Sequence, residues 1–107
     1  MALELIPREM LQQVAGRFRL LGEPVRLEIL NLLHVHGEMN VQELIDATGQ
    51  QQANVSKHLK LLADADMVSR RKEGLFVYYS VLDPSLSGLC LLVCGQLPSS
   101  TPALEEA

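Results

Sequence analysis

This 107-residue chain has few of the features that characterise disulfide-rich, membrane-spanning or secreted proteins. Two cysteines are too few for a disulfide scaffold. Apolar runs extend over only a few residues, which excludes a transmembrane helix, and residues 1–10 lack the apolar segment of a secretory signal peptide. We therefore expect a cytoplasmic protein that makes no membrane contact. Seven glycines and five prolines leave room for long regular elements.

Sequence motifs of common enzymes are also missing. The chain contains no glycine-rich phosphate loop, no nucleophile motif and no pair of catalytic carboxylates. We therefore do not expect an enzyme.

The composition favours one small globular domain. Hydrophobic residues make up 48% of the chain and charged residues 21%, which is enough apolar material for a single core. A chain of this length buries a modest fraction of its surface, so a partner subunit would help it. We assign the domain to residues 1–97. Residues 98–107 contain two prolines, small polar residues and acids, and are expected to form a disordered tail.

The charge is unevenly distributed. The net charge of −4 argues against a nucleic-acid-binding protein. Residues 50–72, however, hold five basic residues and two acidic ones, a local excess of three positive charges. One basic face on an acidic body is therefore expected.

Four helices are predicted in the first two thirds of the chain. Apolar residues at helical spacing predict helices over 7–21 and 24–36, the second being apolar around most of its circumference and therefore central. Asn40 and Glu43 have the spacing of a capping box and predict a short helix that ends at Gly49. A fourth helix is expected over 51–66.

The periodicity then changes. Residues 67–72 and 75–81 are rich in β-favouring residues and flank an acid-glycine turn, which predicts a hairpin. Asp83 and Pro84 then suit the N-cap and first position of a last helix, which reaches about residue 97. The expected fold is mostly α with one β-hairpin, in the order α-α-α-α-β-β-α of a winged helix-turn-helix. The second helix of such a pair is built to enter the DNA major groove.

The candidate recognition helix, 51–66, has two distinct faces. Val55, Leu59 and Leu62 share the side that faces the core, and the opposite side is polar and cationic. His58 falls at the edge of the buried side, so we interpret it as a packing or internally hydrogen-bonded residue. Amides and hydroxyls read base edges and cations neutralise phosphates. The candidate DNA-binding residues are Gln51, Gln52, Asn54, Ser56, Lys57 and Lys60 on this helix, with Arg70, Arg71 and Lys72 on the first strand of the hairpin.

Three segments resemble one known family. Residues 21–30 (LGEPVRLEIL), 52–62 (QANVSKHLKLL) and 74–79 (GLFVYY) resemble the central helix, recognition helix and wing of the ArsR/SmtB-family repressors. The resemblance implies a homodimer paired through the first and last helices. It further implies binding to imperfect inverted repeats in promoter DNA, with release when an effector, often a metal ion, binds.

The metal ligands of that family do not carry over. Asn40 and Gln42 stand where the family has a Cys-x-Cys pair, and neutral amides are poor ligands for soft or borderline metals. Asp83 matches the acid of an Asp-x-His pair, but Ser85 stands at the histidine. We therefore predict no metal site there and interpret Asp83 as a helix cap.

Cys90 and Cys94 are the effector candidates. Their i, i+4 spacing puts both on one face of the last helix, about 5–6 Å apart at Cβ, which is too far for an unstrained disulfide. If this helix lies at a dimer interface, two facing pairs could bind a metal ion through four thiolates or form an intersubunit disulfide. Alternatively, both are small buried hydrophobic residues. His34 and His36, with Glu38 nearby, are expected to lie near a helix C-terminus rather than to bind a metal.

The sequence thus predicts a DNA-binding regulator, most simply a dimeric repressor of double-stranded promoter DNA. A protein-interaction module that kept the fold without DNA binding is the alternative. The acidic net charge favours the module, and the cluster of cations opposes it. The effector, the operator, the regulated genes and the direction of regulation stay open.

Overall fold

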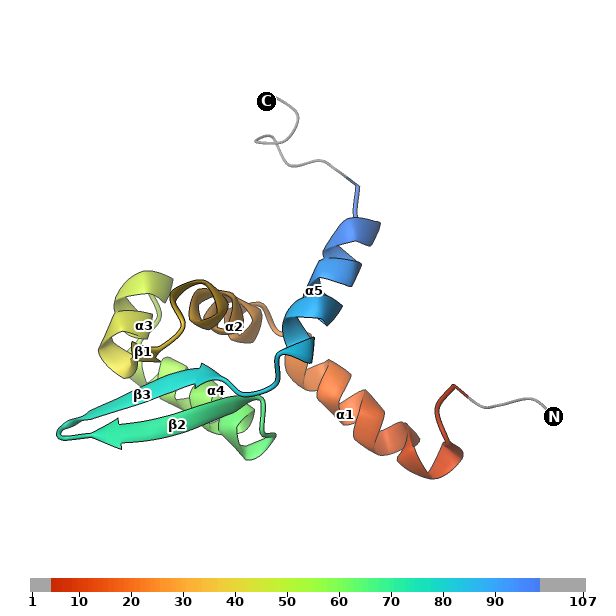
Figure 1. Cartoon of the computed structure of the whole chain (residues 1–107), viewed down its shortest axis with the longest axis horizontal. Helices are drawn as coiled ribbons and strands as arrows, with labels where there is room; N and C mark the ends of the chain where they lie inside the picture. The colour runs from red at the N-terminus through yellow and green to blue at the C-terminus, as the bar shows by residue number, and fades with distance from the viewer. Residues whose placement is uncertain (1–4, 99–107) are drawn as a thin grey trace.

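A computed structural model describes residues 5–98 of the chain. The predicted order of helices and hairpin is confirmed, and so are most element bounds (Figure 1). Of the expected tail, residues 99–107 lie outside the described part. The elements are η1 (Arg8–Met10), α1 (Leu11–Leu21), α2 (Pro24–His36), β1 (Met39–Asn40), α3 (Val41–Thr48), α4 (Gln52–Asp64), β2 (Val68–Glu73), β3 (Phe76–Val81) and α5 (Ser85–Gln96).

Local capping signals set the bounds of the central helices. The Glu23 carboxylate accepts a hydrogen bond from the Arg26 amide at 3.0 Å and caps α2. The predicted capping box of α3 is present, because Asn40 and Glu43 each accept a hydrogen bond from the other's backbone amide at 2.8 Å. Gly49 ends α3 with φ +73°, a left-handed conformation that favours glycine.

Two predictions about element ends need correction. The first helix begins at Leu11 rather than near Pro7, and a short 3₁₀ helix precedes it. The N-cap of α5 is Pro84, not Asp83. The Asp83 carboxylate nevertheless binds the start of that helix, because it accepts hydrogen bonds from the Ser85 amide at 3.0 Å and the Ser85 hydroxyl at 2.6 Å. These two bonds lower the pKa of Asp83.

The hairpin belongs to a three-stranded antiparallel sheet of order β1-β3-β2. Strand β1 was not predicted, since two residues are too short to show a period of two. It pairs with β3 through Met39 opposite Tyr79, on the other side of β3 from β2. The extra strand therefore attaches the middle of β3 to the segment that follows α2.

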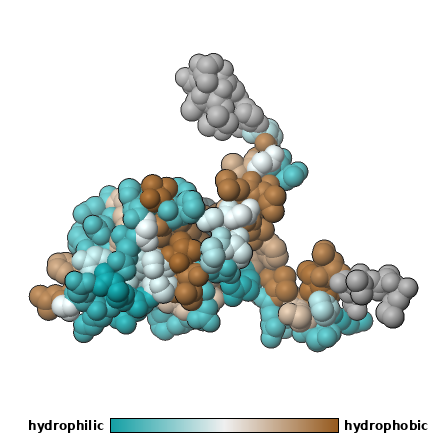
Figure 2. All heavy atoms as spheres, viewed as in Figure 1, coloured by the Kyte–Doolittle hydropathy of each residue, from teal (hydrophilic) through white to brown (hydrophobic). Residues whose placement is uncertain are grey.

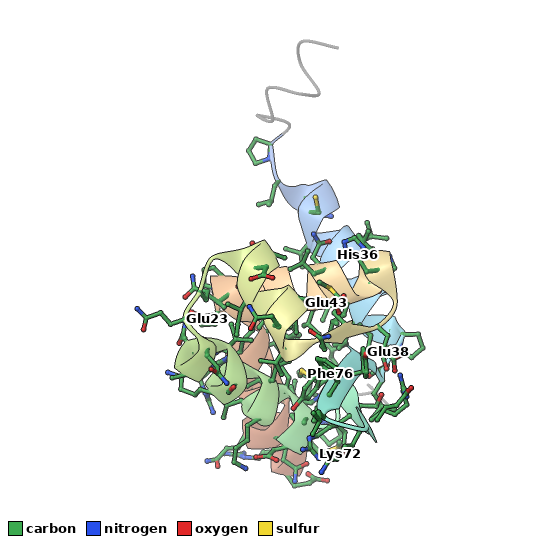
Figure 3. The ribbon with its side chains drawn as sticks, turned by 90° about the vertical axis from the view of Figure 1, so that its left-hand side faces the viewer. Glu23, His36, Glu38, Glu43, Lys72 and Phe76 are labelled. Atoms are coloured by element: carbon green, nitrogen blue, oxygen red, sulfur yellow. The ribbon has the colours of Figure 1, made fainter. Side chains whose placement is uncertain are left out.

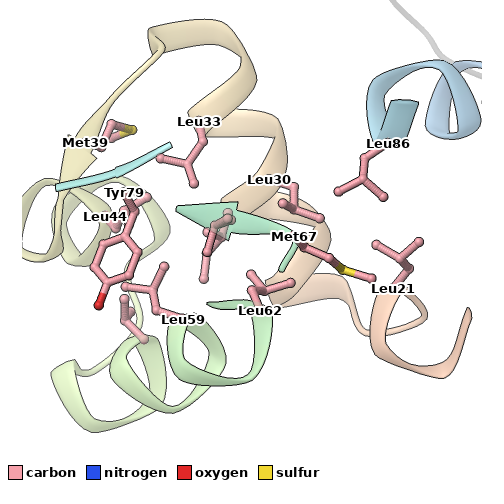
Figure 4. Close-up of a cluster of buried hydrophobic side chains, with 13 residues drawn as sticks. Leu21, Leu30, Leu33, Met39, Leu44, Leu59, Leu62, Met67, Tyr79 and Leu86 are labelled. Carbon is pink, nitrogen blue, oxygen red and sulfur yellow. The ribbon is translucent and has the colours of Figure 1, made fainter. Parts of the chain in front are cut away.

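One apolar core joins the three middle helices to the sheet (Figure 4). Ile29 and Leu33 of α2, Leu44 of α3 and Leu59 of α4 are essentially fully buried in it. The prediction that α2 is the central helix is thus confirmed. The core also fixes which face of α4 is left for solvent.

Helices α1 and α5 project from this core (Figure 1). Leu21 is the buried residue of α1 and Leu86 that of α5. Apolar atoms cover much of the projecting α5 surface (Figure 2). Within residues 5–98, none of the helices is long and apolar enough to cross a membrane.

Candidate nucleic-acid interface

Helix α4 exposes the polar face that the sequence predicts. Val55, Leu59 and Leu62 are buried in the core, as helical spacing indicates. The exposed positions of α4 and its N-cap carry amide, hydroxyl and ammonium groups from Gln51, Gln52, Ser56, Lys57 and Lys60. An exposed helical face of this chemistry can donate to and accept from base edges and can neutralise phosphates.

Two residues of this face already have side-chain partners. The Asn54 amide is half-buried and donates to Gln50 Oε1 at 2.6 Å. Lys60 Nζ lies 3.1 Å from Asp64 Oδ2 in an exposed i, i+4 pair, which contributes little and breaks easily. Across residues 5–98, the structure gives no side-chain hydrogen bond or ion pair to Lys57.

The N-terminus of α4 is open. Its N-cap, Gln51, makes no side-chain hydrogen bond to the helix. The Gln51 carbonyl accepts the amides of Asn54 and Val55, so the earlier amides of the first turn have no intrahelical acceptor. Such amides, at the positive end of the helix dipole, favour an anion such as a phosphate.

His58 fixes α4 to the helices behind it. The side chain is 4% exposed, and its Nδ1 accepts a hydrogen bond from Arg26 Nε at 3.0 Å. Arg26 also donates to the Leu20 carbonyl at 3.0 Å. Burial lowers the pKa of His58, Glu23 opposes that shift, and Arg26 and Lys57 add to it. The prediction of an internally hydrogen-bonded histidine is confirmed.

The hairpin separates its three cations onto two faces. Arg70 pairs with Tyr79 and Lys72 with Val77, so these two cations lie on the face that continues from buried Tyr79. Arg71 pairs with Tyr78 and lies on the other face. The core-side face of the hairpin therefore carries Arg70 and Lys72 on exposed positions toward its free end (Figure 3, where Lys72 is labelled).

Arg71 is held by acidic and aromatic neighbours. Its guanidinium donates two hydrogen bonds of 2.9 Å to the Glu38 carboxylate and another to Glu73. It also lies 4.8 Å from the centre of the Tyr78 ring. The bond from Arg71 lowers the pKa of Glu38. Arg71 therefore ties the hairpin to the end of α2, a role that sequence analysis missed because Glu38 is 33 residues away.

The two cysteines are free and exposed on α5. The interpretation of Cys90 and Cys94 as buried residues is thus wrong for the single chain. Both line an apolar groove of about 600 Å³ between α1, α2 and α5. On its rim, His34 Nδ1 and the Ser87 hydroxyl are 3.0 Å apart, which joins α2 to α5.

The donor groups of one chain do not form a metal centre in the described part. Among residues 5–98 no three His, Cys, Asp or Glu side chains are placed to hold one ion. The Asn40 oxygen is used in the capping box, and Gln42 donates to Asp46 at 2.9 Å. The α3 positions therefore do not fit a metal, while Cys90 and Cys94 supply two thiols and would need further ligands.

Known proteins share both the sequence pattern and the fold. Residues 23–70 match the family model described as "Bacterial regulatory protein, arsR family". An uncharacterized HTH-type transcriptional regulator of Methanocaldococcus jannaschii is 36% identical over 79% of this chain and 96% of its own length. The "Probable mercury resistance operon repressor" of Streptomyces lividans is 39% identical over 82% of this chain and 70% of its own. The crystal structure of M. tuberculosis Rv0081 superposes with a TM-score of 0.76 at 28% identity, covering 83% of this chain and 89% of that one.

Proposed function

Because the chain belongs to the arsR family of bacterial regulatory proteins, which are DNA-binding transcriptional regulators and not enzymes, we propose that it represses transcription as a homodimer bound to an inverted repeat in promoter DNA. Promoter binding requires access to the chromosome, so we propose the cytoplasm as its location. In this proposal each protomer occupies one half-site, with α4 in the major groove.

The observation that carries the proposal is that α4 and the β2–β3 hairpin both carry exposed cations. Lys57 lies on the solvent face of α4, and Arg70 and Lys72 lie on the core-side face of the hairpin. In this arrangement Gln52 and Ser56 contact base edges, and the open first turn of α4 binds a phosphate. The DNA backbone is contacted by Lys57, Lys60, Arg70 and Lys72. Arg71 holds in position the β2–β3 hairpin, which is the wing of this fold.

The apolar surfaces of α1 and α5 support the homodimer. Helix α5 is apolar around its whole circumference, and Leu91 is 72% exposed in the single chain. A helix of this kind is stable in water only when it is covered. Phe18 of α1 is also exposed and lines the groove beside α5. A second copy covers both helices at once and brings two α4 helices into one complex.

Cys90 and Cys94 are the proposed effector site. Two copies paired through α5 supply four thiols, which suits a thiophilic metal ion. Without a metal, a two-electron oxidant such as hydrogen peroxide would take two electrons and two protons from facing thiols and leave an intersubunit disulfide. The mercury resistance repressor named above is a relative whose name includes a thiophilic metal.

DNA binding is tested with duplexes selected from a random pool by the full-length chain. Fluorescence anisotropy is then measured for wild type, Lys57→Glu and Arg70→Glu. Arg8→Glu in η1 makes the same charge change far from α4 and the wing, and serves as the matched control. We expect the first two variants to lose a strongly salt-dependent affinity and the control to keep it. Failure to select any duplex, or equal effects of all three changes, would contradict the proposal.

The effector site is tested on the same complex. Anisotropy is recorded under reducing conditions, after peroxide treatment, and with Zn(II), Ni(II) or Cu(I), for wild type and the Cys90→Ser/Cys94→Ser double variant. We expect one treatment to release wild type alone. Binding that is indifferent to every treatment would leave both thiols without a regulatory role.

A further inference from the structure

One side chain joins three helices behind the proposed DNA-binding surface. Arg26 lies in the first turn of α2 and is half-buried. Its Nη1 donates to the Leu20 carbonyl near the end of α1, and its Nε donates to His58 Nδ1 of α4, both at 3.0 Å. Arg26 therefore connects α1 to α4, although these two helices are far apart in the sequence.

The backbone that carries Arg26 is itself fixed. Pro24 begins α2, and the Glu23 carboxylate accepts a hydrogen bond from the Arg26 amide at 3.0 Å. This bond is the largest cause of the lowered pKa of Glu23, and the charge of Arg26 also lowers it. The guanidinium of Arg26 thus extends from a capped turn, with a carboxylate nearby.

The other contacts that hold the buried face of α4 have no preferred direction. Val55, Leu59 and Leu62 pack in the apolar core, and the hydrophobic effect is non-directional. A hydrogen bond differs, because it weakens steeply as the donor angle departs from linearity. His58 is next to Lys57 on α4, so a directional bond to the His58 ring restricts the rotation of the exposed face about the helix axis.

A second polar contact joins α1 to α4. Arg17 Nη1 donates at 2.9 Å to the carbonyl of Ala65, the C-cap of α4. Helix α1 thus holds α4 near its middle through Arg26 and at its end through Arg17. In the proposed dimer α1 lies at the subunit interface, so these contacts set where each α4 lies relative to the α4 of the second copy.

We propose that Arg26 is a positioning residue that fixes the rotation of α4 relative to α1, and thereby sets the half-site spacing that the dimer accepts. This inference rests on the proposed DNA binding as a homodimer. Two recognition helices on one rigid frame fit half-sites only at the separation that the frame imposes. Without the bonds of Arg26, each α4 can turn on its apolar contacts, and the dimer tolerates other separations.

The bond to His58 depends on the protonation of the ring. Nδ1 accepts from Arg26, so it carries no proton while the bond exists. A proton on Nδ1 would set one donor against another and place a second positive charge beside the guanidinium. The other charged groups that act on His58 are Glu23, which favours the proton, and Lys57, which opposes it. The bond should therefore break as the pH falls.

The test uses the full-length chain and a duplex with two half-sites, selected from a random pool. Derived duplexes have one base pair added or removed between the half-sites, and another keeps a single half-site. Arg26→Met removes both side-chain bonds with little loss of volume, and Arg8→Met in η1 is the matched control. Affinities are measured by anisotropy, and circular dichroism shows whether each variant is folded.

We expect wild type and Arg8→Met to lose at least about tenfold in affinity when the spacing changes, as much as for a mismatched base pair. Arg26→Met should bind the selected duplex about tenfold more weakly than wild type, because a hydrogen bond from a charged donor is lost. A change of spacing should then cost this variant less than about threefold, about a third of that bond's effect. Its affinity for the single half-site should stay within about twofold of wild type, because the base contacts of α4 are intact.

A pH series gives a second measurement, which decides alone if Arg26→Met does not fold. His58→Asn keeps an acceptor for Arg26 near the position of Nδ1 and has no titratable ring. Between about pH 7.5 and 5.5, wild type should lose affinity and spacing preference, and His58→Asn should keep both. His34 and His36 are present in both proteins, so their titration affects both equally.

Three results would overturn this inference alone. They are an unchanged spacing preference in folded Arg26→Met, an equal loss on every duplex including the single half-site, and an equal pH effect in wild type and His58→Asn. Failure of wild type to bind any selected duplex would overturn the proposed function as well.

Discussion

Lys57 and Arg71 should affect DNA binding in different ways although both are cations at the proposed interface. Lys57 has no carboxylate partner among residues 5–98, whereas Arg71 is bound to Glu38 and Glu73. Release of counterions from DNA depends on the number of phosphates that the protein neutralises. A cation that is already paired within the protein should contribute little to that number.

The expected salt dependence of DNA binding follows from the ion pairs. Of the cations proposed to contact the DNA backbone, Lys57, Arg70 and Lys72 have no carboxylate partner in the described structure, which makes six in a dimer; Lys60, which is paired with Asp64, is left out of this count. At a slope of about −0.9 per phosphate, the logarithm of the binding constant falls with the logarithm of salt concentration with a slope of about −5. Affinity should therefore drop about a thousandfold between 50 and 200 mM salt.

The assay is anisotropy of a selected duplex at a series of salt concentrations. Lys57→Gln removes one cation from each protomer, so the slope should become shallower by about 2. Arg71→Gln should lower affinity, because the wing loses its link to α2, but should leave the slope within about half a unit of wild type. If Arg71→Gln changes the slope as much as Lys57→Gln does, Arg71 contacts phosphate in the complex and the reasoning from its ion pairs is refuted.

Three further predictions concern stability. Burial lowers the pKa of His58 from its ordinary value of 6.5, so at mildly acidic pH the unfolded chain binds a proton that the folded chain does not. The free energy of unfolding is therefore at its full value above about pH 6.5 and decreases as the pH falls further. Urea unfolding at pH 7.5 and 5.5 should therefore show a smaller pH effect in His58→Gln, and an equal effect would contradict the assignment. Leu59→Ala empties a fully buried position and should cost about 2–5 kcal/mol of unfolding free energy in urea melts, whereas the exposed Val35→Ala should cost under about 0.5 kcal/mol. Asn40→Ala removes the acceptor of the α3 capping box and should cost about 1 kcal/mol, with Asn40→Asp near wild type; equal losses in both would mean that the cap does not stabilise α3.

Features encoded by neighbouring residues were predictable from the sequence. The bounds of α2 and α3 follow from caps and glycines that act within one turn, and the buried face of α4 follows from helical spacing. The polar face of α4 was therefore also predictable, as the side opposite Leu59.

Features that depend on distant residues were not predictable. Strand β1 exists because β3 lies beside it, and the ion pair of Arg71 needs a carboxylate from the end of α2. Cys90 is exposed because α5 packs on the core of its own chain mainly through Leu86. The spacing of apolar residues alone does not show how much of a helix packs on the core. Sequence reasoning also counted three equivalent cations on the hairpin, whereas strand pairing divides them.

The uncovered α5 helix has a consequence for how the protein meets its operator. If a second copy is what covers α5, the stability of the chain is tied to its own abundance, and dilution exposes the apolar helix. A duplex with two adjacent half-sites holds two chains at a high effective concentration even when few are present. The operator would then do more than receive a finished dimer: it would promote dimer assembly, and a single half-site would leave α5 exposed to water.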